Sequence, residues 1–356
     1  MDQKNWLGKL LDAAIKENAS DLHITAGHPP VLRILRNLID MKAEKSIMPE
    51  ESLALAESMM TEEQKEKFKK EREIDFSYGF KDRARFRVNV YFESGNVAVA
   101  LRLVPKKIRT IEELNLPEIL HKFTLISHGL VLITGASSQG KSTTLAALID
   151  EINHSRRAHV ITIEDPIEYI FIDDKCLIDQ REVFSDTLSF ARALRSTLRE
   201  DPDVIMVGEM RDLETIATAI TAAETGHLVF ATLHTNNASQ TIHRVIDVFP
   251  PHQQNQIMAQ LSVSLVSVVS QQLIAGPKNN AFPACEIMFN NSAISNLIRE
   301  NKVHEIPSVI ETSGDEGMAP LNKTLVELVK TKKITKEIAE NHSFNPEDLR
   351  SRLSRF

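Results

Sequence analysis

Apolar and polar residues follow two different periods along the chain, and the change of period predicts two domains. Residues 6–17 and 49–71 show the spacing of amphipathic and solvated helices. Between residues 74 and 104 the period falls towards two, which is typical of antiparallel strands. The first part, residues 1–104, is therefore predicted to be a small α+β domain. Proline and charge without strong periodicity indicate a linker over residues 105–116.

Short apolar runs alternate with helical patterns in the rest of the chain, residues 117–356. This alternation favours a mainly parallel α/β sheet followed by a helical C-terminal region. The predicted strands are residues 130–133, 160–163, 204–207, 228–233 and 282–289. The predicted helices are residues 188–199, 213–225, most of 253–275, and several within 293–356.

A phosphate-binding pattern follows the first of these strands. Residues 135–142 read Gly-Ala-Ser-Ser-Gln-Gly-Lys-Ser, which matches the P-loop pattern G-x-x-x-x-G-K-[ST] between a strand and a helix. Glycines let the backbone turn N–H groups towards phosphate oxygens, and the helix N-terminus adds partial positive charge. Lys141 is expected to reach the β- and γ-phosphates of ATP, and the hydroxyl of Ser142 to coordinate Mg²⁺. The candidate nucleotide-binding residues here are Gly135, Ala136, Ser137, Ser138, Gln139, Gly140, Lys141, Ser142 and Thr143.

Acidic and histidine side chains follow three other predicted strands. Ligands of open α/β sheets bind at the carboxyl ends of the strands, where Glu164, Glu209 and His234 are expected to meet the P-loop. Hydrolysis needs a carboxylate that orients or deprotonates the attacking water, and the Walker B arrangement places an acidic residue beside the Mg²⁺ shell. Both glutamates are candidates for both roles.

Two histidines flank the predicted strand at residues 228–233. His227 and His234 are seven residues apart, so in a straight strand they point to opposite faces and need not share a site. His227 is a candidate nucleotide-binding residue and His234 a candidate phosphate-sensing residue, although each taken alone would more often be structural. A metal site on this pair is not expected, because no third ligand has suitable spacing.

Arginines gather on the predicted strands of the first domain. Arg85 and Arg87 share one face of their strand because side chains alternate, and Arg102 lies on the next strand. Two interpretations stay open. The three residues are either solvated arginines or a basic, catalytic face turned towards a neighbour's triphosphate, since the arginine fork suits phosphate oxygens.

The composition narrows the function classes. The chain has 356 residues, of which 42% are hydrophobic, and a net charge of −7, which gives no electrostatic reason to expect nucleic-acid binding. Cys176 and Cys285 form no C-x-x-C pair, which argues against a disulfide framework or zinc site and fits a reducing cytosol. No run of 18 apolar residues predicts a membrane span, and residues 1–6 lack the apolar core of a signal peptide. Any membrane role is therefore expected to come through a partner.

Four sequence blocks in order carry a family resemblance. Residues 135–142, 162–168, 195–209 and 225–235 are similar to the Walker A, Asp, Walker B and His boxes of the secretion ATPase superfamily. Within it, the chain resembles the type IV pilus retraction ATPases, the PilT family. The supporting matches are residues 19–23, 85–89, 180–183, 208–216 and 293–300.

The resemblance implies a PAS-like N-terminal domain, a RecA-like P-loop ATPase domain with C-terminal helices, and a homohexameric ring. It implies ATP and Mg²⁺ as ligands, with Glu164 activating water and Glu209 in the Mg²⁺ shell, although the reverse assignment stays open. Arg85, Arg87 and Arg102 match the arginine-bearing strands that close over the phosphates. The implied partners are the inner-membrane pilus platform protein and a paralogous retraction ATPase. The ring would work on the cytoplasmic side of the inner membrane and drive pilin depolymerisation and twitching motility.

Three departures from the family pattern suggest alternatives. The P-loop interior, residues 136–139, is Ala-Ser-Ser-Gln instead of the usual Pro-Thr-Gly-Ser, and Ser138 thus replaces a glycine, which is unfavourable if that position needs a positive φ. Ser295 stands where the family usually has arginine, in a motif needed for retraction. The tail, residues 345–356, resembles the accessory paralogue PilU more than PilT.

An accessory ring subunit that binds ATP with low turnover is therefore the main alternative. A pilus extension ATPase is disfavoured, because those relatives usually carry a longer N-terminal region and a tetracysteine zinc site. A DNA-translocating motor is disfavoured by the acidic net charge.

Overall fold

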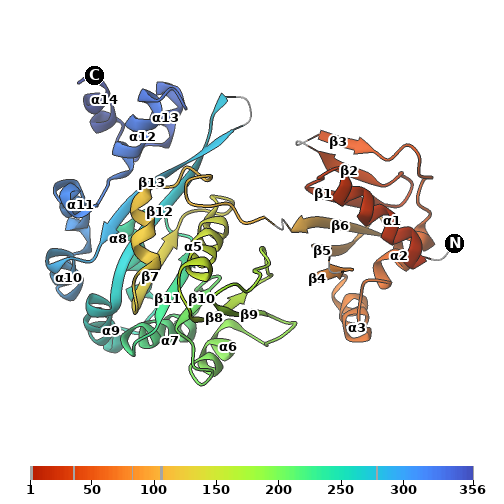
Figure 1. Cartoon of the computed structure of the whole chain (residues 1–356), viewed down its shortest axis with the longest axis horizontal. Coiled ribbons are helices and arrows are strands. Elements are labelled where there is room, and N and C mark those ends of the chain that lie inside the picture. The colour runs from red at the N-terminus through yellow and green to blue at the C-terminus, as the bar shows by residue number, and fades with distance from the viewer. Residues whose placement is uncertain (1–2, 35–36, 82, 105–106, 278–279, 356) are drawn as a thin grey trace. The chain divides into compact units, whose positions relative to one another are not determined.

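The computed structural model describes residues 3–34, 37–81, 83–104, 107–277 and 280–355. The chain divides into two compact units (Figure 1). The first comprises Met1–Lys107 with Pro166–Ile170, and the second Ile108–Asp165 with Phe171–Phe356. The start of the predicted linker, residues 105–106, lies outside the described residues.

An antiparallel sheet forms the centre of the first unit, and six of its strands lie in the described residues, in the order β3-β2-β1-β6-β5-β4. The strands are β1 Asp21–Thr25, β2 Val31–Ile34, β3 Asn37–Asp40, β4 Glu73–Phe80, β5 Ala84–Glu93 and β6 Asn96–Val104. The helices are α1 Gln3–Lys16, α2 Pro49–Glu57 and α3 Glu62–Glu71. The predicted α+β organisation of this part is confirmed.

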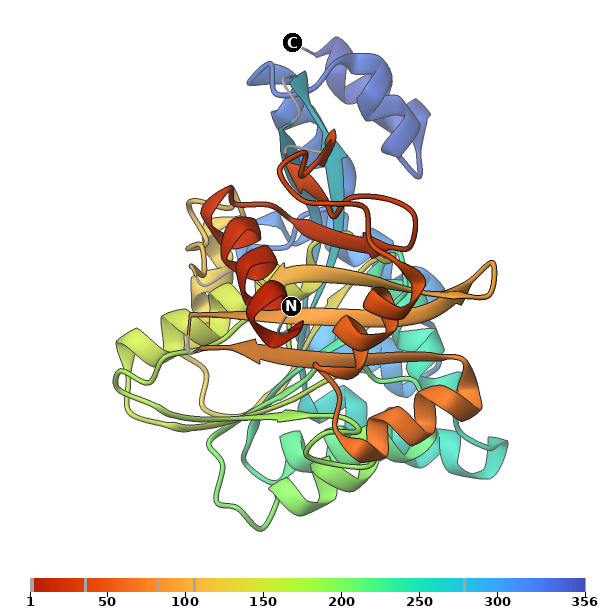
Figure 2. The same cartoon turned by 90° about the vertical axis from the view of Figure 1, so that its right-hand side faces the viewer.

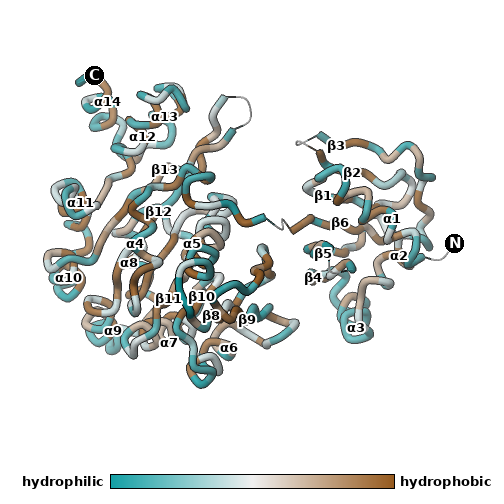
Figure 3. The backbone as a smooth tube through the Cα atoms, viewed as in Figure 1, coloured by the Kyte–Doolittle hydropathy of each residue, from teal (hydrophilic) through white to brown (hydrophobic). Residues whose placement is uncertain are grey.

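Helices α1 and α2 pack on one face of this sheet (Figure 2), because each presents an apolar stripe to it. Trp6 and Leu10 of α1 are buried against Leu22 of β1 and Phe86 of β5 in a single core. Helix α3 differs, since it is hydrophilic along nearly all of its length (Figure 3) and buries Phe68. The charged stretch in this helix is therefore a solvated face, as predicted.

A mostly parallel sheet forms the centre of the second unit, with seven strands in the part of the chain that the structure describes, ordered β13-β12-β7-β11-β10-β8-β9. Strand β13 is antiparallel to β12, and the other pairings are parallel. The strands are β7 Gly129–Thr134, β8 His159–Glu164, β9 Leu177–Glu182, β10 Val204–Val207, β11 Leu228–Leu233, β12 Leu265–Ala275 and β13 Ala281–Phe289. Strands β7, β10 and β11 are wholly buried, which explains their unbroken apolar sequences.

Helices follow most of these strands, so the α/β class predicted for this part is confirmed. They are α4 His121–Thr124, α5 Lys141–Ser155, α6 Phe190–Thr197, α7 Leu213–Glu224, α8 Ala238–Asp247, α9 Pro251–Ser264, α10 Ser292–Arg299, α11 Ile306–Thr312, α12 Leu321–Lys330, α13 Lys336–His342 and α14 Pro346–Ser354. Short 3₁₀ turns occur at Glu118–Leu120, Val303–Glu305 and Gly314–Glu316.

The prediction of one helix over most of residues 253–275 is wrong. Helix α9 ends at Ser264, and β12 then runs beside β7 in the sheet. The β-branched residues Val266, Val268 and Val269 favour this strand, and burial in the sheet outweighs the weak helical pattern of the preceding residues. Strand β12 thus brings a segment distant in sequence alongside the strand that leads into the P-loop.

The C-terminal helices pack on the hairpin of β12 and β13 (Figure 1). Ile274 of β12 and Ala284 of β13 are buried with Leu325 of α12 and Leu349 of α14 in a separate apolar cluster. Among the described residues, no helix is long and apolar enough to cross a membrane.

Candidate active site

Four neighbouring parallel strands of the second unit end at one edge of the sheet, and each end carries a predicted site residue. Thr134 of β7 is in register with Leu233 of β11, so the P-loop begins beside His234. Val207 of β10 is in register with Ile163 of β8, so Glu164 and Glu209 leave the sheet next to each other. The order β7-β11-β10-β8 therefore brings together the P-loop, His234, Glu209 and Glu164.

The two glycines that bound the P-loop are required by its close packing on β12. Gly135 has a φ of 145°, and a Cβ there would lie 2.3 Å from the carbonyl oxygen of Gln271. Gly140 has a φ of 83°, and a Cβ there would lie 2.9 Å from the Gln271 side-chain nitrogen. The left-handed backbone and the lack of space both exclude larger side chains.

Lys141 is buried and turned into the loop. Its Nζ donates hydrogen bonds to the carbonyl oxygens of Gly135, at 2.8 Å, and Ala136, at 2.9 Å. Helix α5 begins at this lysine behind Gly140, which has no side chain that could cap the first backbone N–H groups. A buried lysine and a helix N-terminus behind a glycine loop form a cradle for phosphate, so the residues present fit a bound nucleotide.

The interior of the loop departs from ordinary backbone geometry at Ser138, which has a φ of 63°. This is the left-handed region that favours glycine. The sequence-based concern about a serine at this position is therefore justified by the structure. Ala136, Ser137 and Ser138 are exposed, whereas Gln139 is half-buried.

Glu164 is buried at the end of β8, and two neighbours hold its carboxylate. Thr162 Oγ1 donates to Glu164 Oε1 at 2.7 Å, and Gln180 Nε2 donates to the same oxygen at 3.0 Å. Gln180 lies on β9, the edge strand beside β8, and is itself held by the backbone N–H of Phe171 at 3.0 Å. The direction of this carboxylate is thus determined by the sheet.

Gly208 lies between β10 and Glu209. It has no side chain, which lets β10 approach β8 closely, since a Cβ there would lie 3.1 Å from the carbonyl oxygen of Ile163. The Glu209 carboxylate contacts Arg211 Nε at 2.7 Å and His234 Nε2 at 3.5 Å. It therefore links the end of β10 to the end of β11.

The predicted magnesium ion would need a nucleotide as a further source of ligands at this end of the sheet. Among the described residues, no group of three His, Cys, Asp or Glu side chains could hold a metal alone. Mg²⁺ is usually bound by one or two protein groups together with substrate phosphates, which suits Ser142 in the first turn of α5 and Glu209. Thr143 follows in the same turn and is half-buried.

His227 is not brought to this edge. It precedes β11, whereas His234 follows it, and seven residue steps of ~3.3 Å separate the two by roughly 23 Å. The His227 ring Nδ1 lies 3.0 Å from the carbonyl oxygen of Ala222 at the end of α7. Within one chain His227 is thus part of the opposite edge, and its predicted nucleotide contact stays a prediction.

The three predicted arginines lie in the first unit. Arg87 of β5 is directly opposite Arg102 of β6, and Arg85 is on the same face of β5. Arg102 Nε donates to Asp21 at 2.9 Å, and Asp21 also lies 3.8 Å from Arg33. With Arg87 opposite Arg102, three arginines and one carboxylate thus lie in a row across these neighbouring strands.

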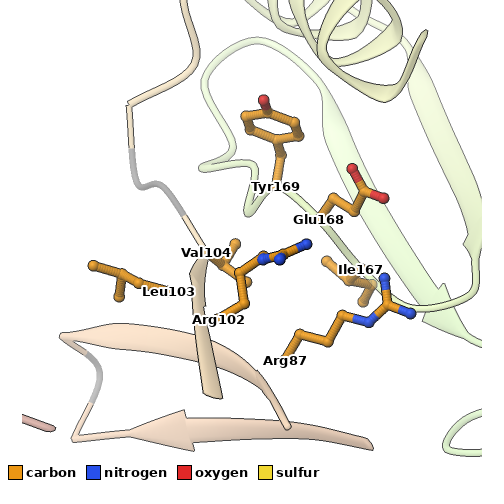
Figure 4. Close-up of a pocket in the computed structure, with 7 residues that line it drawn as sticks. All are labelled: Arg87, Arg102, Leu103, Val104, Ile167, Glu168 and Tyr169. Atoms are coloured by element: carbon orange, nitrogen blue, oxygen red, sulfur yellow. The ribbon is translucent and has the colours of Figure 1, made fainter. Parts of the chain in front are cut away.

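A pocket of about 220 Å³ adjoins Arg87 and Arg102 in this unit. Glu168 and Tyr169 line it on the side towards which both arginines extend (Figure 4). The remaining lining residues are Leu103, Val104 and Ile167. The predicted role of Arg85, Arg87 and Arg102 towards phosphate stays a prediction.

Several residues that hold the site were missed from the sequence. Gln180 and Thr162 bond the Glu164 carboxylate. Gln271 bonds Gln139 of the P-loop, and Thr144 bonds Gln271. Gln271 is missed because its segment is predicted as a helix. Its β-branched neighbours could have indicated a strand, but not the pairing of that strand with β7.

The comparisons with known proteins agree with this geometry. The chain matches the family described as Type II/IV secretion system protein over residues 3–352. It is 45% identical over 344 residues to the type IV pilus retraction ATPase PilT of Pseudomonas aeruginosa, covering 96% of this chain and 98% of that protein. It is 40% identical to the type IV pilus ATPase PilU of the same organism, covering 96% and 90% of the two chains.

The structure is also similar to the crystal structure of the pilus retraction motor PilT with bound ADP. The TM-score is 0.90 at 45% sequence identity, and the match covers 97% of this chain and 98% of that one. The similarity therefore extends over both units, each of which has a counterpart in that protein.

Proposed function

The chain belongs to the Type II/IV secretion system protein family, and from that premise we propose that it is an ATP-hydrolysing motor that powers retraction of a type IV pilus. One observation carries the proposal: the similarity to a pilus retraction ATPase covers nearly the whole of both chains at 45% identity. The P-loop and the residues Glu164, Glu209 and His234 at one sheet edge supply the chemistry that such a motor needs.

The reaction is hydrolysis of ATP to ADP and inorganic phosphate. Lys141 and the backbone of the P-loop bind the phosphates, and the lysine exchanges its bonds to Gly135 and Ala136 for bonds to phosphate oxygens. Ser142 and Glu209 would hold Mg²⁺, which would supply positive charge beside the phosphates. Glu164, directed by Thr162 and Gln180, orients the attacking water and accepts its proton.

The assembly is proposed to be a homohexamer on the cytoplasmic side of the inner membrane, where ATP is available. It would act on a pilus platform protein, alone or with a paralogous retraction ATPase. Family membership supports this arrangement. The expected product of its work is return of pilin subunits to the membrane, and hence twitching motility.

Two measurements test the proposal. The purified protein should release phosphate from ATP, and Lys141→Ala should abolish that release while the variant remains folded, as checked by thermal unfolding. A deletion strain should accumulate pili and lose twitching. Loss of pili instead would make the chain an extension ATPase and overturn the proposal.

A second candidate function is an accessory ring subunit with low turnover. The left-handed backbone at Ser138 favours it, because a strained P-loop could bind nucleotide yet align it poorly for hydrolysis. Phosphate release at background level by a protein that binds ADP would support this candidate over the motor.

A further inference from the structure

We propose that Gln271 of β12 is a positioning residue for nucleotide binding, which holds the P-loop in its phosphate-binding shape. The proposal rests on the proposed ATPase function and deepens it. Gln271 is 3% exposed and lies beside the loop rather than within it. It belongs to none of the sequence blocks that predicted the site.

The Gln271 side chain joins the loop to the helix behind it. Its Nε2 donates to the carbonyl oxygen of Gln139 at 2.7 Å. Its Oε1 accepts a hydrogen bond from Thr144 Oγ1 in α5 at 2.8 Å. The amide thus uses both its donor and its acceptor in a buried position. Loss of either partner there would leave a buried polar group without a hydrogen bond, which lowers the stability of the fold.

The bond to Gln139 determines how one peptide group faces. In a planar trans peptide the C=O and the following N–H point in opposite directions. With the Gln139 carbonyl held on β12, the N–H of Gly140 points away from β12. A flip of this peptide would replace a donor for phosphate with a carbonyl oxygen, which repels anions.

Further contacts make β12 a rigid support for the loop. The backbone N–H of Leu273 donates to the side chain of Gln139, and Ser270 Oγ lies 2.8 Å from Thr134 Oγ1 of β7. Gln271 also lies against both glycines that bound the loop: a Cβ would lie 2.3 Å from its backbone oxygen at Gly135 and 2.9 Å from its side-chain nitrogen at Gly140. Loop and strand therefore fit each other at several points, with Gln271 at the centre.

The neighbouring Gln272 offers a matched control. It is the same residue type on the same strand, but its side chain points to the opposite face. There its Oε1 lies 3.0 Å from His342 Nδ1 of α13. Gln272→Ala therefore removes an equal number of atoms from β12 and leaves the P-loop contacts in place.

The experiment measures binding of a fluorescent ADP analogue to the full-length protein, with thermal unfolding in parallel. The nearly isosteric Thr144→Val should weaken ADP binding about tenfold, the change expected from one lost hydrogen bond, and Gln271→Ala, which removes both bonds, should weaken it about 10- to 100-fold. Thr144→Ser, which keeps the hydroxyl, should retain the ADP affinity of the wild type. Gln272→Ala should bind ADP within twofold of the wild type. In steady-state kinetics, KM for ATP should rise while kcat changes less, because uniform binding is lost.

The outcomes are separable from those of the proposed function. Thr144→Val keeps the test decisive if Gln271→Ala does not fold. ADP binding by both variants within twofold of the wild type would overturn the proposal, as would an equal loss in Gln272→Ala. A wild-type protein that binds ADP but releases no phosphate would refute the motor function, while the binding comparison would still decide the role of Gln271.

Discussion

Glu209 and His234 are in contact, with the carboxylate 3.5 Å from the imidazole Nε2, although 25 residues separate them in sequence. The contact joins the ends of β10 and β11, which are neighbours in the sheet. His234 is therefore placed to orient the carboxylate that is proposed to face Mg²⁺, and through it to respond to the nucleotide.

Removal of this contact should slow hydrolysis more than it weakens binding. His234→Ala is expected to lower kcat about 10- to 100-fold, the usual effect of losing a group that orients a metal-facing ligand. Phosphate release and ADP binding should be measured together. His243→Ala, on the exposed face of α8, is the control and should behave as the wild type. A loss of ADP affinity equal to the loss of kcat would contradict the assignment.

Glu164 and Glu209 should differ in their dependence on magnesium. Glu164→Gln should lower kcat about 10²- to 10⁴-fold, because it removes the proposed base, and should keep the Mg²⁺ dependence of ATP binding. Glu209→Gln should raise the Mg²⁺ concentration needed for half-maximal binding. A titration of Mg²⁺ at fixed ATP distinguishes the two. The opposite pattern would reverse the two roles.

Ser138 and Ser137 should respond in opposite directions to the same substitution. Ser138→Gly removes the strain of a serine in the left-handed conformation, which stabilises the folded protein by about 1 kcal/mol. Part of this gain is lost because glycine raises the conformational entropy of the unfolded chain. The net gain of about 0.5 kcal/mol should raise Tm by about 1–2 °C. Ser137→Gly relieves no positive φ and should lower Tm. Equal shifts in thermal unfolding would show that Ser138 is not strained.

The junction of α9 and β12 should tolerate loss of Ser295 better than loss of Asn290. Ser295 Oγ donates to the carbonyl oxygen of Ser262 at 2.7 Å, but that oxygen also accepts from Asn290 Nδ2 at 3.0 Å. Asn290 Nδ2 in addition bonds the oxygen of Leu265 at 2.9 Å.

Ser295→Ala should therefore destabilise the protein by about 0.5 kcal/mol, and Asn290→Ala by about 1–3 kcal/mol, since its loss leaves the oxygen of Leu265 without this donor. Urea unfolding measures both. A larger destabilisation by Ser295→Ala than by Asn290→Ala would mean that Ser295 contributes more to the stability of this junction.

Stability should depend on pH through His121. Its Nδ1 lies 2.8 Å from Glu151 and its Nε2 2.9 Å from Glu112. The hydrogen bond to Glu151 is the largest cause that raises the His121 pKa, and the charges of both glutamates add to it. Because the folded pKa is above the unfolded value of about 6.5, the stabilisation is complete below that pH.

This stabilisation should be lost as the pH rises through the folded pKa of His121. Urea unfolding of the wild type between pH 6 and pH 9 should show the decline, and His121→Asn should flatten it. His304→Asn, at an exposed position, is the control and should keep the wild-type slope. A slope unchanged in the His121 variant would assign the effect to other groups.

Features that depend on neighbouring residues in the sequence could be predicted, whereas features that depend on contacts between distant segments could not. The P-loop, Glu164, Glu209 and His234 could be predicted to lie at one end of the sheet, because each stands at or just after the end of a strand with a local signature. The confirmed fold class rests on the same short-range periodicity. Local signals do not indicate which strands pair. Nothing near Gln271 in sequence shows that β12 lies beside β7, and most of the β12 segment is predicted as helix.

Two further residues show the same limit. In the sequence, Gln180 stands out only as part of a family match, whereas its hydrogen bond to Glu164 depends on the pairing of β8 with β9. His227 is predicted to bind nucleotide as part of the block at residues 225–235, yet β11 separates it from His234 by the length of a strand. Strand pairing decides the first case and strand length the second.

The pairing of β12 with β7 also has a consequence for synthesis of the chain. Thr134 and Ser270 are 136 residues apart, and at ~5–20 residues per second the ribosome needs about 7–27 s to pass from one to the other. During that interval the P-loop exists without its support. Until β12 is made, β7 has β11 to pair with on one side, while its other side and the P-loop lack the contacts that β12 supplies.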